Sequence, residues 1–393
     1  MGRDTAEQRR GLFSEKLRRM GVGLAIISNP KHIFYLTGLS SNLNPYIAAG
    51  KGQRSTSFAA IGSEGECSVL LGRSESQTVQ ANAGAPSSDR KVSVYNDYDL
   101  DVTMVAYAAD VAVEMRKWLR KSVMVRGEPV PRRVAVEDWH LADIYRETVA
   151  RTFQESKLAG VSQVIMELRK IKGQDELDNI RQAAKMLDFA YGIAEEVTKA
   201  GKTELDVFSE MNRASFERYG VFGLVGGDVI SGERTLDAGG YATKRKLERG
   251  DTMVMDMQAV HHNYWCDTAR TFIVGRPSAA QKKVLETILE AKEMAAKMLI
   301  PGTRTADIAD SVNAFLEKRG HARLPHHAGH TVGLDDQEMP WLIHGSAEVV
   351  RESQAFVIEP GVYEKETGGM RVEDCYFVTK NGREKVSRFP LVF

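Results

Sequence analysis

Five residues in the last third of the sequence have the types and spacing of a metal-ligand set. They are Asp256, Asp267, His330, Glu359 and Glu373, and each lies in a segment typical of a strand or a loop edge. Carboxylate oxygens bind hard divalent cations, and one imidazole moves the preference toward the transition metals. Two cations held about 3.5–4 Å apart could activate a shared water as a nucleophile. The sequence therefore predicts a dinuclear metal centre.

The setting of these carboxylates makes a chance arrangement a poor explanation. Asp256 stands in an apolar run, where an unpaired carboxylate is costly, although a buried salt bridge would explain one such residue equally well. Residues 259–265 can turn a hairpin that brings Asp256 and Asp267 to one face. Two nearby carboxylates repel each other unless a cation or a proton lies between them. Glu359 and Glu373 repeat the anomaly on two further strands.

Hydrophobic periodicity predicts two domains that would position these residues. Residues 1–160 alternate helix and strand, which is typical of an α/β layered domain. Residues 161–393 predict an α+β domain, in which helices back a mainly antiparallel sheet and the site lies on the other face of that sheet. The expected helices are 8–20, 104–119, 142–152, 174–199, 281–299 and 305–319, and the expected strands are 23–28, 55–61, 67–71, 252–260, 268–274, 355–358 and 370–379.

Composition indicates a soluble globular protein without a charge-driven partner. The chain has 393 residues, of which 42% are hydrophobic and 27% are charged. Its 53 basic residues balance its 53 acidic ones, so no overall field draws it to nucleic acid or to an anionic membrane. Three cysteines without a C-x-x-C pattern, and the lack of a signal peptide or a long apolar run, predict a cytoplasmic location.

Longer stretches around the ligands resemble a known family. They are similar to the pita-bread superfamily of methionine aminopeptidase, aminopeptidase P, prolidase and creatinase, and most of all to Xaa-Pro dipeptidase (prolidase)-like proteins. Residues 1–160 resemble the creatinase/prolidase amino-terminal domain through the run 29–38. The stretches that carry the resemblance in 161–393 are 168–172 (LRKIK), 250–251 (GD), 266–271 (CDTART), 325–330 (PHHAGH), 358–363 (IEPGVY) and 369–373 (GMRVE).

This resemblance implies roles for the five ligands. In the family the second Asp and the last Glu bridge two metals, which gives those roles to Asp267 and Glu373. The first Asp, here Asp256, holds one metal, and the pair corresponding to His330 and Glu359 holds the other. The resemblance also implies a homodimer, a dipeptide or other small-molecule substrate, and two divalent ions, with manganese expected and cobalt, zinc or iron as alternatives. It implies cleavage of a peptide or amide bond by a metal-bridging hydroxide, with Glu359 passing the proton to the leaving nitrogen.

Three positions depart from the peptidases of this family. A second His usually follows the ligand His by seven residues, where this chain has Gln337, and another usually lies where it has Gly239. Gln258 replaces a common Gly two residues after the first ligand, and we expect it to reach into the site. His326 matches a Pro-His motif of prolidase and is a candidate site-lining residue, and Gln337 is the candidate in place of the auxiliary His. The acids 335–336 are an alternative general base, or two solvated loop residues.

Three functions remain open at this point. The first is a dinuclear hydrolase similar to prolidase or aminopeptidase P. The second is a specialised small-molecule enzyme on the same fold, similar to creatinase, ectoine hydrolase or the dimethylsulfoniopropionate lyases, and the absent histidines favour it. The third is a binding protein that kept the fold, against which the complete ligand set argues. Fold alone does not separate them.

Overall fold

The structure is a computed structural model that describes residues 3–39, 57–73, 91–96, 104–124, 129–220 and 225–390. The chain divides into two compact units, Met1–Arg169 and Lys170–Phe393, so that residues 161–169 belong to the first unit. The first two residues of the expected strand 55–61 lie outside the described residues. No helix within the described ranges is long and apolar enough to cross a membrane.

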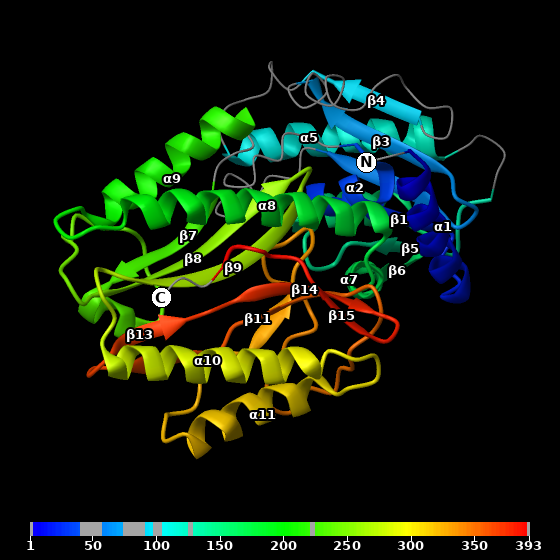
Figure 1. The fold of residues 1–393 in the computed structure, drawn as a ribbon. Coiled ribbons are helices and arrows are strands. Elements are labelled where there is room, and N and C mark those ends of the chain that lie inside the picture. The colour runs from blue at the N-terminus through cyan, green and yellow to red at the C-terminus, as the bar shows by residue number, and fades with distance from the viewer. Residues whose placement is uncertain are drawn as a thin grey trace. The chain divides into compact units, whose positions relative to one another are not determined.

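The first unit alternates strands and helices around one mixed sheet (Figure 1). Its strands are β1 (Leu24–Ile27), β2 (Phe58–Gly62), β3 (Cys67–Gly72), β4 (Lys91–Tyr95), β5 (Arg133–Val136) and β6 (Lys157–Gly160), and its helices are α1 (Arg3–Arg19), α2 (Pro30–Thr37), α5 (Met104–Trp118), α6 (Asp143–Thr152) and α7 (Ser162–Arg169). The strand order is β4-β3-β2-β1-β5-β6. β1, β2 and β3 are buried along their whole length, as expected of short strands covered on both faces. The α/β prediction is confirmed.

Helix α2 was missed by the sequence analysis, although its ends carry clear capping residues. The Asn29 side chain accepts a hydrogen bond from the Lys31 N–H at 3.0 Å, and Pro30 occupies the first turn, where its missing N–H costs nothing. Gly38 ends the helix with a φ of 71°, a conformation that favours glycine. With only eight residues, α2 is too short to show a strong helical period.

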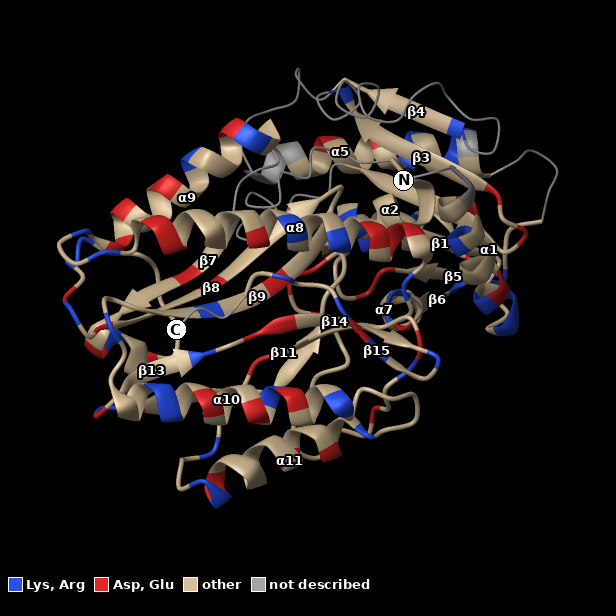
Figure 2. Ribbon diagram, viewed as in Figure 1, with Lys and Arg blue, Asp and Glu red and all other residues tan. Residues whose placement is uncertain are grey.

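The second unit consists of antiparallel strands backed by long helices, which confirms the α+β prediction (Figure 1). Its helices are α8 (Gln174–Val197), α9 (Glu204–Tyr219), α10 (Ala279–Lys297) and α11 (Thr305–Lys318), and its strands are β7 (Val225–Ser231), β8 (Thr252–His261), β9 (Tyr264–Ile273), β10 (Gly329–Thr331), β11 (Ala355–Ile358), β12 (Gly361–Glu364), β13 (Gly368–Arg371), β14 (Asp374–Thr379) and β15 (Gly382–Lys385). The sheets are β7-β8-β9, β10-β11-β14-β15 and β12-β13. Helix α8 packs on β8 and β9, and α10 on β11. Both α8 and α10 carry acidic and basic residues (Figure 2).

The expected hairpin joins β8 to β9 through a two-residue turn. His261 pairs with Tyr264, and the turn residues His262 and Asn263 both have positive φ, at 45° and 70°. Positive φ at both central positions is the mark of a type I′ turn, whose twist matches that of the strands it joins. The turn fixes the register of the hairpin, and this register decides which side chains share a face.

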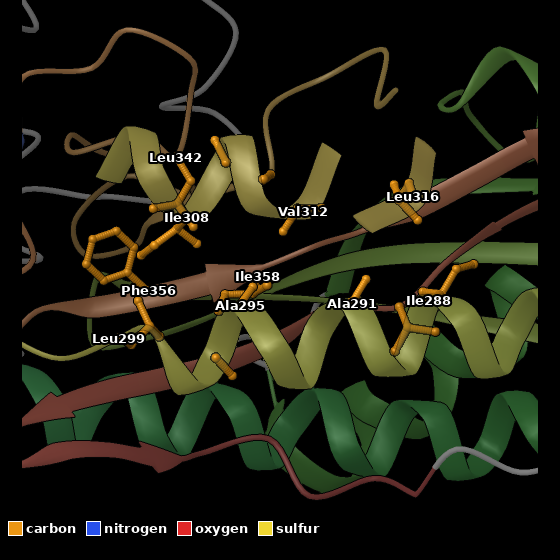
Figure 3. Close-up of a cluster of buried hydrophobic side chains, with 14 of the residues drawn as sticks. Ile288, Ala291, Ala295, Leu299, Ile308, Val312, Leu316, Leu342, Phe356 and Ile358 are labelled. Atoms are coloured by element: carbon orange, nitrogen blue, oxygen red, sulfur yellow. The ribbon is translucent and has the colours of Figure 1, made fainter. Parts of the chain in front are cut away.

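A buried apolar cluster holds β11 in place beneath the ligands. Phe356 and Ile358, two residues apart on β11, both face α10 and α11 (Figure 3). Because side chains alternate along a strand, the next residue, Glu359, is directed away from this cluster. The residues labelled in the cluster are Ile288, Ala291, Ala295, Leu299, Ile308, Val312, Leu316, Leu342, Phe356 and Ile358.

One expected element is wrong. The sequence predicts a single strand over 370–379, whereas the structure has two strands in different sheets, β13 with β12 and β14 with β11. The chain changes sheets at Val372 and Glu373, where the Val372 N–H donates to the Pro360 carbonyl and the Glu373 N–H to the Ala269 carbonyl. Residues 370–378 contain no Gly or Pro that would mark this break, so the sequence alone did not show it. The break sets the Glu373 backbone beside β9.

Candidate metal centre

The β-strands of the second unit bring the five predicted ligands together. In the β8–β9 register Asp256 lies opposite Ala269, and Gln258 lies opposite Asp267. Asp256, Gln258 and Asp267 therefore share one face of the hairpin. His330 lies on β10, opposite Val357 of β11, and Glu359 and Glu373 follow the ends of β11 and β13.

The ligand atoms converge on the imidazole of His330. Its Nε2 lies 3.9 Å from Asp267 Oδ2, 3.7 Å from Glu359 Oε1 and 3.9 Å from Glu373 Oε1. The donor atoms of Asp267, His330 and Glu373 all lie within 4.8 Å of one another. Asp256 joins the cluster through its contact with the Asp267 carboxyl group. The structure thus places the five residues near one another, and their binding of metal stays a prediction.

Hydrogen bonding fixes which nitrogen of His330 faces the carboxylates. His330 Nδ1 lies 3.0 Å from the Thr331 carbonyl oxygen, which can only accept a hydrogen bond. Nδ1 therefore carries the proton, and the lone pair of Nε2 points at the cluster. A histidine whose other N–H is held by a carbonyl is typical of a metal ligand.

Because the acidic cluster is buried, keeping its carboxylates ionised destabilises the fold unless positive charge lies nearby. Asp267, Glu359 and Glu373 are at most 5% exposed. Burial, followed by the charge of Asp256, raises the pKa of Asp267 far above its usual value, and burial, followed by Asp267, does the same to the pKa of Glu373. Among the described residues, Asp256 Oδ1, Glu359 Oε1 and Glu373 Oε2 are buried without a hydrogen-bond partner. Buried oxygens aimed at one another in this way fit a divalent cation set.

One guanidinium partly balances the cluster. Arg371 Nη2 lies 2.6 Å from Asp256 Oδ2, and Arg371 Nη1 donates to Tyr363 Oη at 3.0 Å. If all four carboxylates are ionised, as metal binding requires, one guanidinium leaves three negative charges unmatched, which is more than one divalent cation supplies. The sequence analysis missed both Arg371 and Tyr363. Arg371 stands two residues before Glu373 in a strand-like run, and that spacing was the available signal.

A second buried network holds the Glu373 backbone. Arg270 Nη1 donates to the Glu373 carbonyl at 2.5 Å, and its Nη2 donates to Asp374 Oδ1 at 2.8 Å. Lys292 and Lys385 also pair with Asp374. Burial raises the pKa of Asp374, but Arg270 and the two lysines outweigh it and leave the pKa lower than usual. Asp374 is thus a structural acid that has its own cationic partners, whereas its neighbour Glu373 has a buried oxygen without a hydrogen-bond partner among the described residues.

His326, proposed to line the site, lies beside Glu359. Its Nδ1 is 2.7 Å from the His327 carbonyl oxygen and 3.7 Å from Glu359 Oε2, and its Nε2 is 2.7 Å from Tyr363 Oη. Since a carbonyl only accepts, Nδ1 carries the proton and Nε2 accepts from the tyrosine. The hydrogen bonds orient this ring and occupy both of its nitrogens.

The three departures from the family pattern lie in different settings. Gln258 reaches the site as expected, because its Nε2 lies 3.1 Å and 3.3 Å from the two oxygens of Asp267. Gln337 is exposed, and its side chain forms no described interaction with the ligands; its N–H donates to Asp336 Oδ1 at 3.1 Å. Asp336 is also exposed. A side chain at Gly239 would place its Cβ 2.6 Å from Asp228 Oδ2.

Asp228 is a second acid that the sequence analysis did not single out. It lies on β7 directly opposite Asp256, so both side chains occupy the same face of the sheet. Its Oδ1 accepts a hydrogen bond from the Gly240 N–H at 2.9 Å, and its Oδ2 is 3.8 Å from Arg371 Nη2. The glycines around it concealed a strand that the sequence analysis did not predict.

Comparisons with known proteins identify the families that the two units match. Residues 178–380 match metallopeptidase family M24, and residues 9–171 match the creatinase/prolidase N-terminal domain. An Xaa-Pro dipeptidase of Pyrococcus horikoshii is 32% identical over 235 residues, which are 58% of this chain and 65% of that protein. One of Pyrococcus furiosus is 30% identical over 235 residues, 58% of this chain and 66% of that protein. The matched segment thus spans slightly less than two thirds of either relative.

Solved structures show the same fold over nearly the whole chain. The crystal structure of the prolidase from Pyrococcus horikoshii OT3 covers 98% of this chain and 99% of its own, with a TM-score of 0.77 at 23% identity. The structure of an Xaa-Pro dipeptidase from Bacillus anthracis covers 98% of this chain and 99% of its own, with a TM-score of 0.79 at 20% identity. At these identities the likeness concerns the fold.

Proposed function

We propose, from the premise that this chain belongs to metallopeptidase family M24, that it is a hydrolase dependent on two divalent cations. Its substrate in this proposal is a dipeptide or similar small amide, cleaved next to an imino acid as the names of the Xaa-Pro dipeptidase relatives suggest. The observation that carries the proposal is the buried, mutually repelling pair Asp267 and Glu373 around His330 Nε2.

Five residues would hold the cations. Asp267 and Glu373 would each serve both ions, Asp256 one of them, and His330 with Glu359 the other. When bound, the ions would supply Lewis acidity for the substrate carbonyl and a nucleophilic water at neutral pH. The oxygen-rich donor set supports manganese as the expected ion, with cobalt, zinc and iron as alternatives.

The chain's own side chains would orient this chemistry and move the proton. Glu359 would accept the proton of the attacking water and pass it to the leaving nitrogen. His326, held by Tyr363, lies next to Glu359 Oε2, where its ring would line the substrate site. Arg371 would hold Asp256 in position.

Metal removal tests this function directly. We expect protein stripped with a chelator to lose hydrolysis of Xaa-Pro dipeptides and to regain it when manganese or cobalt is added back. Full turnover by the stripped protein would contradict the proposal. The same assay on exposed Asp307→Asn protein controls for the general effect of losing a carboxylate.

Asp228 favours a second candidate function, an enzyme that acts on a small zwitterion. The peptidase histidine expected at Gly239 has no room unless Asp228 moves, so a carboxylate stands where those peptidases present an imidazole. A carboxylate there would attract a cationic group of the substrate. A panel of Xaa-Pro dipeptides and tripeptides against creatine, ectoine and dimethylsulfoniopropionate separates the two candidates. Turnover of the peptides alone would eliminate the second.

Assembly and location belong to the proposal as well. The family resemblance supports a homodimer, which sedimentation of the purified protein would test. All three cysteines are buried and none forms a disulfide, which supports a reducing, cytoplasmic environment.

A further inference from the structure

The imidazole of His327 lies against the metal centre, and its Nδ1 has no well-aligned hydrogen-bond partner among the described residues. His327 Nδ1 lies 2.7 Å from Glu359 Oε1, yet their relative orientation gives neither atom a hydrogen bond among the described residues. Both atoms are fully buried, although the His327 side chain as a whole is 20% exposed. A close nitrogen–oxygen pair that is not hydrogen-bonded is typical of two donors to a common cation.

His326 provides a contrast within the same cluster. The donor atoms of His326, His327 and Glu359 lie within 4.8 Å of one another. Both nitrogens of His326 are engaged, one with the His327 carbonyl and the other with Tyr363 Oη. His326 could bind a cation only by giving up one of these bonds, whereas His327 Nδ1 gives up none.

Neighbouring rings hold His327 in this orientation. Its ring meets Trp341 edge to face, with centroids 4.7 Å apart, and meets His330 nearly perpendicularly at 5.3 Å. Edge-to-face packing between rings is favourable and fixes the plane of the imidazole. Nδ1 is therefore held beside Glu359 Oε1, the oxygen that also lies 3.7 Å from His330 Nε2.

We propose that His327 is a sixth metal ligand, which gives the cation held by His330 and Glu359 a second imidazole through Nδ1. With bonds of about 2.1 Å, donors to one ion lie about 3–3.4 Å apart. The separations of Glu359 Oε1 from His327 Nδ1 and from His330 Nε2, 2.7 Å and 3.7 Å, bracket this range. The inference rests on the proposed function only in requiring that a metal centre exists.

A second imidazole has a consequence for metal selectivity. Nitrogen donors favour zinc and cobalt over manganese, because the softer ions bind imidazole more strongly than oxygen. One of the two positions should therefore prefer zinc, while the position of Asp256 stays oxygen-rich and suits manganese. The manganese preference expected from the family resemblance would then apply to one position only.

Calorimetric titration of chelator-stripped protein with zinc and then with manganese tests this selectivity. His327→Gln should weaken one zinc site by about tenfold or more and leave manganese binding within about threefold. His326→Gln should leave both zinc affinities within about threefold, because its nitrogens are not donors. Exposed His344→Gln is the control for losing a surface histidine. Thermal unfolding of each variant confirms that it is folded.

Diffraction from zinc-loaded wild-type crystals at the zinc edge locates the ligand directly. We expect an anomalous peak about 2.1 Å from both His330 Nε2 and His327 Nδ1. Zinc peaks at His330 with His327 Nδ1 about 3 Å or more from every peak would overturn the proposal, as would unchanged zinc affinity in His327→Gln. Absence of any bound cation would instead contradict the proposed function itself.

Discussion

Buried carboxylates occur in both units of this protein, and their surroundings differ in a way that separates structure from function. In the first unit, Glu137 accepts hydrogen bonds from the Ser28 N–H at 2.8 Å, from the Asn29 N–H at 2.6 Å and from His32. Burial raises its pKa, but these donors outweigh it and lower the pKa to about 2. In the second unit, Asp267 and Glu373 face other acids, and their pKa values are raised.

This difference shows how to interpret a buried acid. Glu137 is 1% exposed, as is Glu373, so burial alone does not distinguish the two. The two acids differ in their hydrogen-bond donors. Around Glu137, Arg169 Nη1 donates to His32 Nε2 at 2.8 Å and completes a hydrogen-bonded network. Glu373 Oε2 has no hydrogen-bond partner among the described residues. An acid that the chain itself satisfies stabilises the fold, and one left unsatisfied requires a ligand from outside.

The largest effect is expected from the bridging acids. Asp267→Asn or Glu373→Gln should reduce hydrolysis of Xaa-Pro dipeptides by about 1,000-fold or more, about 4 kcal/mol in the barrier, because each removes a ligand shared by both ions. Steady-state kinetics measure the loss. Activity near that of wild type, with a normal metal content, would show that the acids do not bridge.

Glu137 should instead affect stability. Glu137→Ala leaves the buried His32–Arg169 network without its acceptor, which should cost about 3–5 kcal/mol of unfolding free energy. Thermal unfolding monitored by calorimetry measures the change. Glu147→Ala removes an exposed salt bridge with Arg151 and should cost less than about 1 kcal/mol. Equal losses of unfolding free energy at the two positions would show that the buried network around Glu137 does not stabilise the fold.

pH should act in opposite directions on the two kinds of acid. The pKa of Glu137 is lowered to about 2 from 4.5, so its stabilisation is present above pH 4.5 and is lost as pH falls toward 2. The raised pKa values of Asp267 and Glu373 mean that their contribution in metal-free protein is present at low pH and is lost as pH rises through those raised values.

The melting temperature of metal-free protein therefore provides a pH test. Glu137 stays ionised until the pH falls toward about 2, whereas the raised pKa values of Asp267 and Glu373 make the folded metal-free protein more stable as the pH falls. We expect metal-free wild type to gain more thermal stability on acidification than metal-free Asp267→Asn. A parallel pH dependence in the two proteins would show that the pair is not destabilising at neutral pH.

A smaller effect is expected from Gln258. Its amide donates to both oxygens of Asp267, and removing such a partner of a metal ligand typically lowers metal affinity by about tenfold. Gln258→Ala should show this loss in a titration with manganese. An affinity equal to that of wild type would mean that the amide does not orient Asp267.

Much of the site could be predicted from sequence because its signals are local. A carboxylate in an apolar run is visible at Asp256, and residues 259–265 indicate the hairpin that brings Asp267 to the same face. The residues that were missed depend on register and on other strands. Finding Asp228 required knowledge of a glycine-rich strand and of its pairing with Asp256. Finding His327 required the direction of one ring nitrogen.

The fold was predictable to a similar extent. Long amphipathic helices such as α8 and α10 were found nearly at their bounds, because the apolar period repeats many times. The short helix α2 was not predicted, because eight residues show little periodicity. The change of sheet at Glu373 was not predicted either, because a single break leaves no periodic signal.

Calorimetric titration with manganese measures how many divalent cations the metal-free protein binds. Wild type should bind two ions per chain, and the double variant Asp267→Asn/Glu373→Gln should lose this binding. No binding by wild type, or unchanged stoichiometry and affinity in the double variant, would contradict the claim that the unsatisfied acids form a metal centre.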